Sequence, residues 1–173
     1  MMLLSLATTP AFADGIQVKA AAFEADGNDY LLRADLNIAL THTLEEALNK
    51  GVALYFVTEF ELSRSRWYWF DKKLMQLKHQ YKLSYNALTR QYRLSVGNLF
   101  QNFATLQDAM GLMSQLRDRV TVETAVLEKG ETYDAALRMR LDVSQLPKPF
   151  QLNAFASRDW NLSSGWHRWE VTP

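Results

Sequence analysis

The sequence predicts a β-rich α+β fold, in which two antiparallel sheets pack in a sandwich-like arrangement with two short helices. Three observations predict it. Apolar and polar residues alternate with a period of two over long stretches, aromatic residues make up 12% of the chain, and only four prolines interrupt it. A chain of 173 residues with 48% hydrophobic content is long enough for one domain with a sizeable core. We therefore expect a single β-rich domain over residues 14–173.

The first thirteen residues have the composition of a signal peptide. Residues 1–7 are mostly apolar, and Ala11, Phe12 and Ala13 form a small-x-small cleavage site, so cleavage near Ala13 would make Asp14 the mature N-terminus. No Lys or Arg precedes the apolar run, which suggests that the true start lies upstream. The run is shorter than the roughly 20 residues that span a bilayer. We expect an exported, periplasmic protein with no integral membrane span.

Strands are expected wherever apolar and polar side chains alternate, because successive residues of a strand point to opposite faces. The segments with this pattern are, in order, 16–24, 30–40, 52–62, 72–85, 89–96, 99–103, 120–127, 132–143 and 166–171. Turn residues at 26–29 predict a hairpin between the first two segments, and those at 128–131 predict a hairpin between 120–127 and 132–143. The segment 52–62 is apolar on both faces at its start, which predicts a central strand.

Two short helices are expected, each beginning at a threonine that can cap it. Thr43 and Thr105 each have an acidic residue three positions later, which is the spacing of a capping box. We expect helices at 44–49 and at 105–116. Residues 150–156 fit a short helix and an extended segment equally well.

Two parts of the chain resemble each other. Tyr30 lies thirteen residues before Thr43, and Tyr92 lies thirteen residues before Thr105. Each tyrosine begins an alternating run, and each threonine opens the pattern Thr-Leu-(Glu/Gln)-(Glu/Asp)-Ala-(Leu/Met). The similarity suggests an internal duplication of two β-β-α-β halves, with the stretch 64–71 as their linker, although so few matched positions also fit chance or convergent capping.

The composition excludes several kinds of site. The absence of Cys excludes a Cys-based zinc site, a disulfide framework and thiol catalysis. The histidines, at positions 42, 79 and 167, are not at metal-ligand spacing, and His79 is expected to be a half-buried structural residue. A formal net charge of zero gives no global field that would attract nucleic acid. Gly-rich phosphate loops and Gly-x-Ser-x-Gly are absent, so we expect no cofactor, no metal and no catalytic residues.

The most biased stretch of the chain is Arg64–Asp71, where two arginines precede four consecutive aromatic residues. One interpretation is a buried corner between two sheets, in which the C-terminal tryptophans pack against Trp67 and Trp69. The other is a recognition patch for a protein partner, peptide or glycan, since Trp, Tyr and Arg are frequent interface anchors. With two arginines on adjoining strands added, the candidate binding residues are Arg64, Arg66, Trp67, Trp69, Arg90 and Arg93. The chain's many arginines are otherwise expected to form ion pairs with acids on strand faces.

Several motifs occur in an order that resembles a known family: Arg66–Asp71, Leu88–Leu94, Phe103–Leu106, Leu146–Gln151 and Ser157–Trp160. Over essentially the whole mature chain, the sequence resembles the bacterial exported family known as domain of unknown function 4390. The resemblance implies a periplasmic or membrane-associated protein of a Gram-negative bacterium, with no assigned activity and no defined catalytic residues. It also implies a gene that often lies near a nitrogen-regulation-type sensor kinase.

We therefore expect a non-enzymatic binding or accessory module. Its expected partner is a membrane protein, such as the extracytoplasmic domain of a neighbouring sensor kinase. The alternative is a cell-envelope protein that binds or hydrolyses glycans and stacks sugars on its aromatic side chains, which a pocket with two close carboxylates would favour. A third hypothesis is a structural envelope protein without a ligand.

Overall fold

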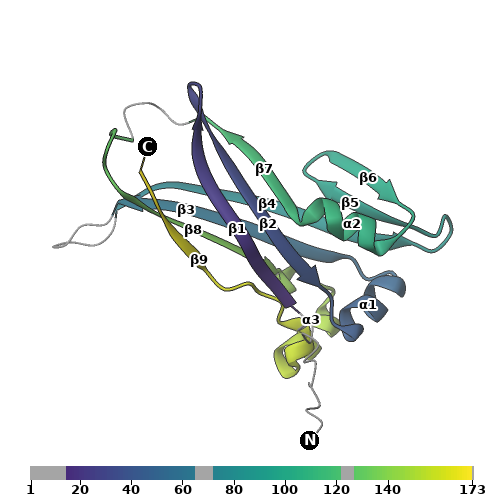
Figure 1. The fold of residues 1–173 in the computed structure, drawn as a ribbon. Helices are drawn as coiled ribbons and strands as arrows, with labels where there is room; N and C mark the ends of the chain where they lie inside the picture. Colours follow the sequence, from purple (N-terminus) through teal and green to yellow (C-terminus); the bar gives the residue numbers. More distant parts are fainter. Residues whose placement is uncertain (1–14, 65–71, 122–126, 173) are drawn as a thin grey trace, which may run out of the picture.

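The computed structural model describes residues 15–64, 72–121 and 127–172 of the chain (Figure 1). The strands are β1 (Gly15–Asp26), β2 (Asp29–Ala39), β3 (Leu54–Arg64), β4 (Lys72–Asn86), β5 (Gln91–Val96), β6 (Leu99–Phe103), β7 (Gln115–Val120), β8 (Tyr133–Leu141) and β9 (His167–Val171). The helices are α1 (His42–Asn49), α2 (Leu106–Met113) and α3 (Lys148–Ala156), with short 3₁₀ helices at Val143–Gln145 and Arg158–Trp160.

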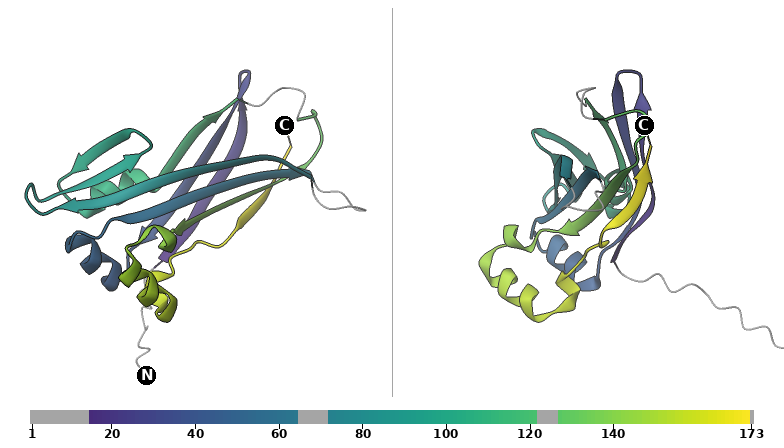
Figure 2. Two further views of the ribbon diagram at one scale, coloured as in Figure 1. Left: turned by 180° about the vertical axis from the view of Figure 1, so that it is seen from behind. Right: turned by 90° about the vertical axis from the view of Figure 1, so that its left-hand side faces the viewer.

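The strands form two sheets, which pack face to face (Figures 1 and 2). The small sheet has the strand order β1-β2-β7, and the large sheet has the order β6-β5-β4-β3-β8-β9. Every pair of neighbouring strands is antiparallel. The β-rich fold of two antiparallel sheets predicted from the alternating pattern is therefore confirmed.

Aromatic residues join the two sheets at the centre of the core. Phe60 of β3 is 1% exposed. Its ring centroid lies 5.2 Å from that of Phe23 on β1 and 6.0 Å from that of Trp169 on β9. Burying large aromatic side chains contributes strongly to stability, so this contact fastens the small sheet to the large one.

The order of elements repeats, as the internal similarity suggests, but the residue equivalence differs. Both β1-β2-α1-β3 and β5-β6-α2-β7 begin with a hairpin that turns at Gly-Asn, and Gly27 and Gly97 have φ values of +66° and +57°. Such turns need a positive φ that glycine adopts without strain. However, Tyr30 is the second residue of β2, whereas Tyr92 is the second residue of β5, one strand earlier in its unit. In addition, β4 follows residues 64–71, so they do not directly join the halves.

The start of α1 differs from the prediction. Thr41, not Thr43, is the N-cap, and its Oγ1 accepts a hydrogen bond from the backbone N–H of Leu44 at 3.3 Å. The hydroxyl of Thr43 instead donates to Asp159 Oδ2 at 3.0 Å. The predicted capping residue of α1, Thr43, was therefore wrong, because the hydroxyl of Thr43 takes part in a tertiary contact instead. The predicted cap of α2 is confirmed, since Thr105 accepts from the N–H of Asp108 at 3.1 Å.

The chain after α2 also departs from the prediction. The helix ends at Met113, and β7 begins at Gln115 rather than at residue 120. The predicted hairpin with 132–143 is wrong, because β7 pairs with β2 in the small sheet while β8 lies between β3 and β9 in the large sheet. The cause is the pairing of β7 with β2, a long-range contact that local alternation does not encode. Residues 122–126 lie outside the described part of the chain.

Residues 150–156, which the sequence leaves undecided between a short helix and an extended segment, belong to the helix α3 (Lys148–Ala156). Phe150 packs on Trp160 with ring centroids 5.7 Å apart. Trp166 lies over Arg138, and Trp169 lies in the aromatic core. Whether these tryptophans contact Trp67 or Trp69 stays untested, because the latter two lie outside the described residues.

Candidate functional site

The predicted binding residues that the structure describes, Arg64, Arg90 and Arg93, lie toward two different ends of the molecule. Arg66, Trp67 and Trp69 lie outside the described residues. Arg64 ends β3, where its Nη1 lies 3.3 Å from Glu128 Oε1 and its Nη2 lies 2.9 Å from Glu131 Oε2. These ion pairs fit the predicted pairing of strand arginines with acids, and they hold the segment at 128–131 against the end of β3.

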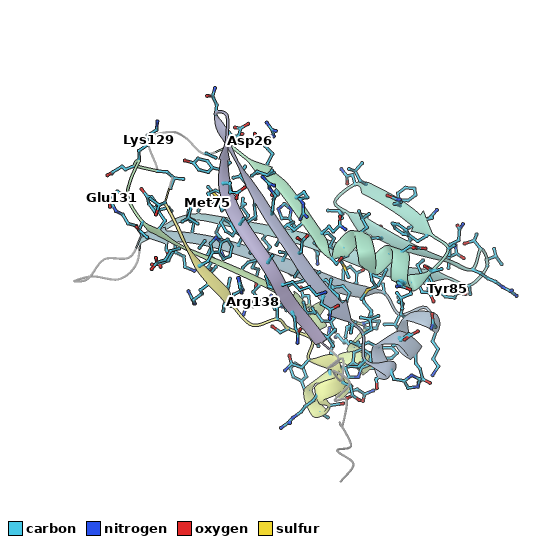
Figure 3. All side chains as sticks on the ribbon, viewed as in Figure 1. Asp26, Met75, Tyr85, Lys129, Glu131 and Arg138 are labelled. Atoms are coloured by element: carbon cyan, nitrogen blue, oxygen red, sulfur yellow. The ribbon has the colours of Figure 1, made fainter. Side chains whose placement is uncertain are left out.

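Arg90 lies in the turn that follows the opposite end of the long strand β4, and Arg93 lies on β5 opposite Ser84, near that end. Residue 72 pairs with Arg64 at one end of β4, whereas Tyr85 pairs with Tyr92 near the other. Figure 3 shows Glu131, a partner of Arg64, and Tyr85 at opposite ends of the molecule. The structure therefore does not bring Arg64 together with Arg90 and Arg93, and they lie on separate surfaces.

Arg93 contacts two side chains of the neighbouring strand β6. Its Nε donates to Asn102 Oδ1 at 2.9 Å, and its guanidinium carbon lies 4.5 Å from the centroid of the Phe100 ring. A guanidinium over an aromatic face is attracted by the electrons of the ring. Arg93 thus orients two side chains on β6, the edge strand of the large sheet.

Arg90 occupies a turn position with φ of +54°, which non-glycine residues rarely adopt. Replacing Arg90 with glycine is expected to raise the free energy of unfolding by up to ~1 kcal/mol, because glycine adopts this conformation without the clash of Cβ. Urea denaturation measures the change. A lower stability for Arg90→Gly would show that the greater conformational entropy of glycine in the unfolded chain, or a stabilising contact of the arginine side chain, outweighs the relief of backbone strain.

A groove, here called the edge groove, runs between β1 and β9. Figures 1 and 2 show the two strands side by side, and each is the outermost strand of its sheet. The groove has a volume of about 370 Å³ and is lined by residues 21–25 and Tyr30 from one sheet and residues 169–172 from the other. In the described part of the chain, no backbone ladder joins β1 to β9, so the two strands meet there with unpaired edges.

The free backbone groups of the edge groove follow from the strand register. Asp26 and Asp29 flank a two-residue turn, so they bond each other, and alternation leaves the N–H groups of Ala21, Phe23 and Ala25 directed away from β2. On β8, the N–H of Leu141 bonds toward Leu162 at 2.8 Å. Every second residue of β8 therefore directs its N–H toward β9 and bonds with the β9 residue opposite to it. Arg168 and Glu170 lie between these bonded residues of β9, so their N–H groups point away from β8.

The indole of Trp169 adds an unpaired donor beside this groove. Its Nε1 is buried and finds no acceptor among the described residues. A buried donor without a partner costs about 1–3 kcal/mol, and such groups are rare in folded proteins. Trp169 therefore marks a place where the fold lacks an acceptor.

A charged cluster of Glu59, Arg138 and Arg140 lies on neighbouring strands β3 and β8, on the face of the large sheet opposite to Phe60. Glu59 is 9% exposed, and its Oε2 accepts from Nε of Arg138 at 2.9 Å and from Nε of Arg140 at 3.4 Å. Burial by itself would raise the pKa of Glu59, but the hydrogen bonds and positive charges of the two arginines outweigh it and lower the pKa. The general acid of a glycosidase needs a raised pKa, so Glu59 does not fit that role.

Comparison with known proteins decides the family. The family model described as "Domain of unknown function (DUF4390)" matches residues 13–170. The chain belongs to the DUF4390 family. No curated protein and no solved structure matches it.

The sequence analysis did not predict the edge groove of this DUF4390 member. Ala21 and Ala22 are inconspicuous in a strand, and no local pattern states which strand lies at the edge of a sheet. The tryptophan in the predicted closing strand was the only local signal. Elsewhere in the described chain, no cluster of three or more His, Asp or Glu could hold a metal ion, and no helix is long and apolar enough to cross a membrane.

Proposed function

We propose that this DUF4390 protein is a non-enzymatic binding module, which takes up an extended segment of a partner protein in the edge groove. The observation that carries the proposal is that the unpaired edges of two different sheets line the same groove. An extended peptide can add a strand to such an edge, and its main-chain hydrogen bonds then provide affinity.

The directions of the two strands set the direction of the added segment. In Figure 1, β1 and β9 both run toward the end of the molecule that carries Asp26 and the C-terminus. A segment that runs the opposite way is antiparallel to both strands. It can therefore bond with the free N–H and C=O groups of β1, of β9, or of both.

The side chains of the groove indicate what the segment contains. Ala21 and Ala25 are small, and Phe23 and Trp169 are aromatic. Alternate side chains of an added strand would point toward these residues, as they do in any strand. We therefore expect a segment with apolar residues at every second position, rather than a densely charged one.

The location and the partner are further proposals. We propose that the protein is exported to the periplasm after cleavage near Ala13, which N-terminal sequencing of the native protein tests. The family resemblance points to the extracytoplasmic part of a neighbouring sensor kinase as partner. Co-purification from native membranes without recovery of that kinase would count against it.

Two proline substitutions test the binding mode. Ala21→Pro and Glu170→Pro each remove one N–H from a free edge without removing a bond of the existing ladders, and proline is tolerated at edge positions of this kind. Peptides selected on wild-type protein from a random library displayed on phage serve as the probe. We expect at least one of the two variants to lower peptide affinity by about tenfold, which corresponds to one lost hydrogen bond of about 1.4 kcal/mol.

Asn102→Pro is the matched control, because it removes a free N–H from β6, far from the groove. It is expected to leave peptide affinity unchanged, and circular dichroism shows whether each variant is folded. Full affinity in both folded groove variants, or no peptide selected above background, would contradict the proposed function.

A further inference from the structure

We propose that β6 pairs with β6 of a second copy of this chain, which makes a symmetric dimer with a continuous sheet. The inference concerns a different edge from the edge groove, so it does not depend on the proposed function. It starts from the chemistry of the sheet edges.

The edge strand β6 carries none of the charges that the other edge strands of the described sheets carry. Its sequence, Leu-Phe-Gln-Asn-Phe, contains no charge and no proline, and Leu99 and Phe100 are 78% and 62% exposed. The other edge strands of the described sheets carry charged residues: β1, with a bulge after Val18, has Lys19 and Glu24, β7 has Arg117, Asp118 and Arg119, and β9 has Arg168 and Glu170. Proteins use such charges and bulges to keep exposed edges from pairing with other copies of the same chain. An uncharged apolar edge is therefore open to pairing.

The absence of charge points to a second copy as the partner. In a two-fold symmetric contact, the same surface meets itself. A strand with a net charge would place like charges opposite each other, which destabilises the pair. The strand β6 itself is neutral, so its own side chains place no like charges opposite each other in such a pair. The guanidinium of Arg93, on β5, lies over the Phe100 ring of its own copy.

The backbone of β6 permits this pairing in a defined register. Val96 and Leu99 flank the two-residue turn and bond each other, so alternation directs the N–H and C=O groups of Phe100 and Asn102 to the free edge. An antiparallel contact centred on Gln101 uses the full strand. It places Phe100 opposite Asn102 of the second copy in a hydrogen-bonded pair, and Gln101 opposite its own symmetry mate.

Neighbouring residues support the same contact. Arg93 fixes both Phe100 and Asn102 from β5, as described above, so it acts as a positioning residue for the edge. Leu112 of α2 is 49% exposed, and α2 packs against β5 and β6. Because a five-residue edge buries a modest area, the dimer is expected to be weak and dependent on concentration.

A charge-swap experiment tests the register. Gln101→Lys and Gln101→Glu each place two like charges face to face at the symmetry axis, and each is expected to weaken self-association about fivefold or more, which corresponds to roughly 1 kcal/mol for a like-charge pair. An equal mixture of the two variants places Lys opposite Glu and is expected to restore association. Sedimentation equilibrium over a concentration series measures the dissociation constants.

Two further variants provide the controls. Asn102→Pro removes an edge N–H in each copy and is expected to abolish association, whereas Gln17→Lys puts the same charge change on the β1 edge and is expected to have no effect. A wild-type protein that remains monomeric at its highest soluble concentration would overturn the proposal. So would a dimer that Asn102→Pro leaves intact, or a mixture of Lys and Glu variants that stays monomeric.

Discussion

Replacing Glu59 with glutamine is expected to lower the free energy of unfolding at neutral pH by about 2–3 kcal/mol. The substitution leaves the guanidinium groups of Arg138 and Arg140 without the carboxylate that they share. Removing one partner of a buried ion pair costs about 3–5 kcal/mol. The arginine side chains are 29% and 30% exposed, so water offsets part of this loss. Urea denaturation of wild type and Glu59→Gln at neutral pH measures the difference.

The effect should depend on pH with a known sign. The pKa of Glu59 is lowered in the folded protein, so its ionised form is favoured by folding. This contribution is fully present above the ordinary pKa of glutamate and is lost as the pH falls through the lowered pKa. Glu59→Gln should therefore destabilise less in acid than at neutral pH. Glu24→Gln, which breaks the exposed pair with Arg33, is the control and should cost less than about 1 kcal/mol. Equal losses for both variants would contradict the structural role given to Glu59.

Replacing Phe60 with alanine is expected to have the largest effect, a loss of about 3–5 kcal/mol in the free energy of unfolding. Phe60 is 1% exposed and lies between Phe23 of the small sheet and Trp169 of the large sheet. The substitution opens a cavity between the sheets and removes both aromatic contacts. Thermal and urea denaturation measure the loss.

Phe100→Ala is the matched control for this cavity, because the same ring is removed from an exposed position on β6. It should change stability by less than about 1 kcal/mol when measured at a concentration at which the chain is monomeric. Similar losses for the two variants would show that Phe60 does not join the sheets.

The alternating pattern predicted most strands because it reports which side of a strand is buried. The segment 30–40, for example, became β2, in which Leu32, Ala34 and Leu36 face the core. Glycine turns and the threonine cap of α2 are local devices, so they were predictable as well. The sequence also indicated that His79 is a half-buried structural residue, and its Nε2 lies 2.7 Å from Asp118 on the facing sheet.

The pairing of strands was not predictable, because it depends on contacts between distant residues. Nothing local distinguishes β7, which joins β2, from a strand that forms a hairpin with β8. The same reason explains why the predicted binding residues were wrongly expected to lie on one surface. Arg64 and Arg93 were grouped by residue type, and β4 separates them. The edge groove exists only because the two sheets end next to each other at β1 and β9.

The most direct test of strand addition at the edge groove is amide hydrogen exchange, followed by NMR with and without a peptide selected on the wild-type protein. The proposed binding mode predicts that bound peptide slows exchange of the free-edge amides of β1 at Ala21, Phe23 and Ala25, of β9 at Arg168 and Glu170, or of both strands. The amides of Phe100 and Asn102 on β6 should be unchanged by the peptide at a fixed protein concentration. Peptide binding that leaves the β1 and β9 amides as fast as before would contradict strand addition at this groove.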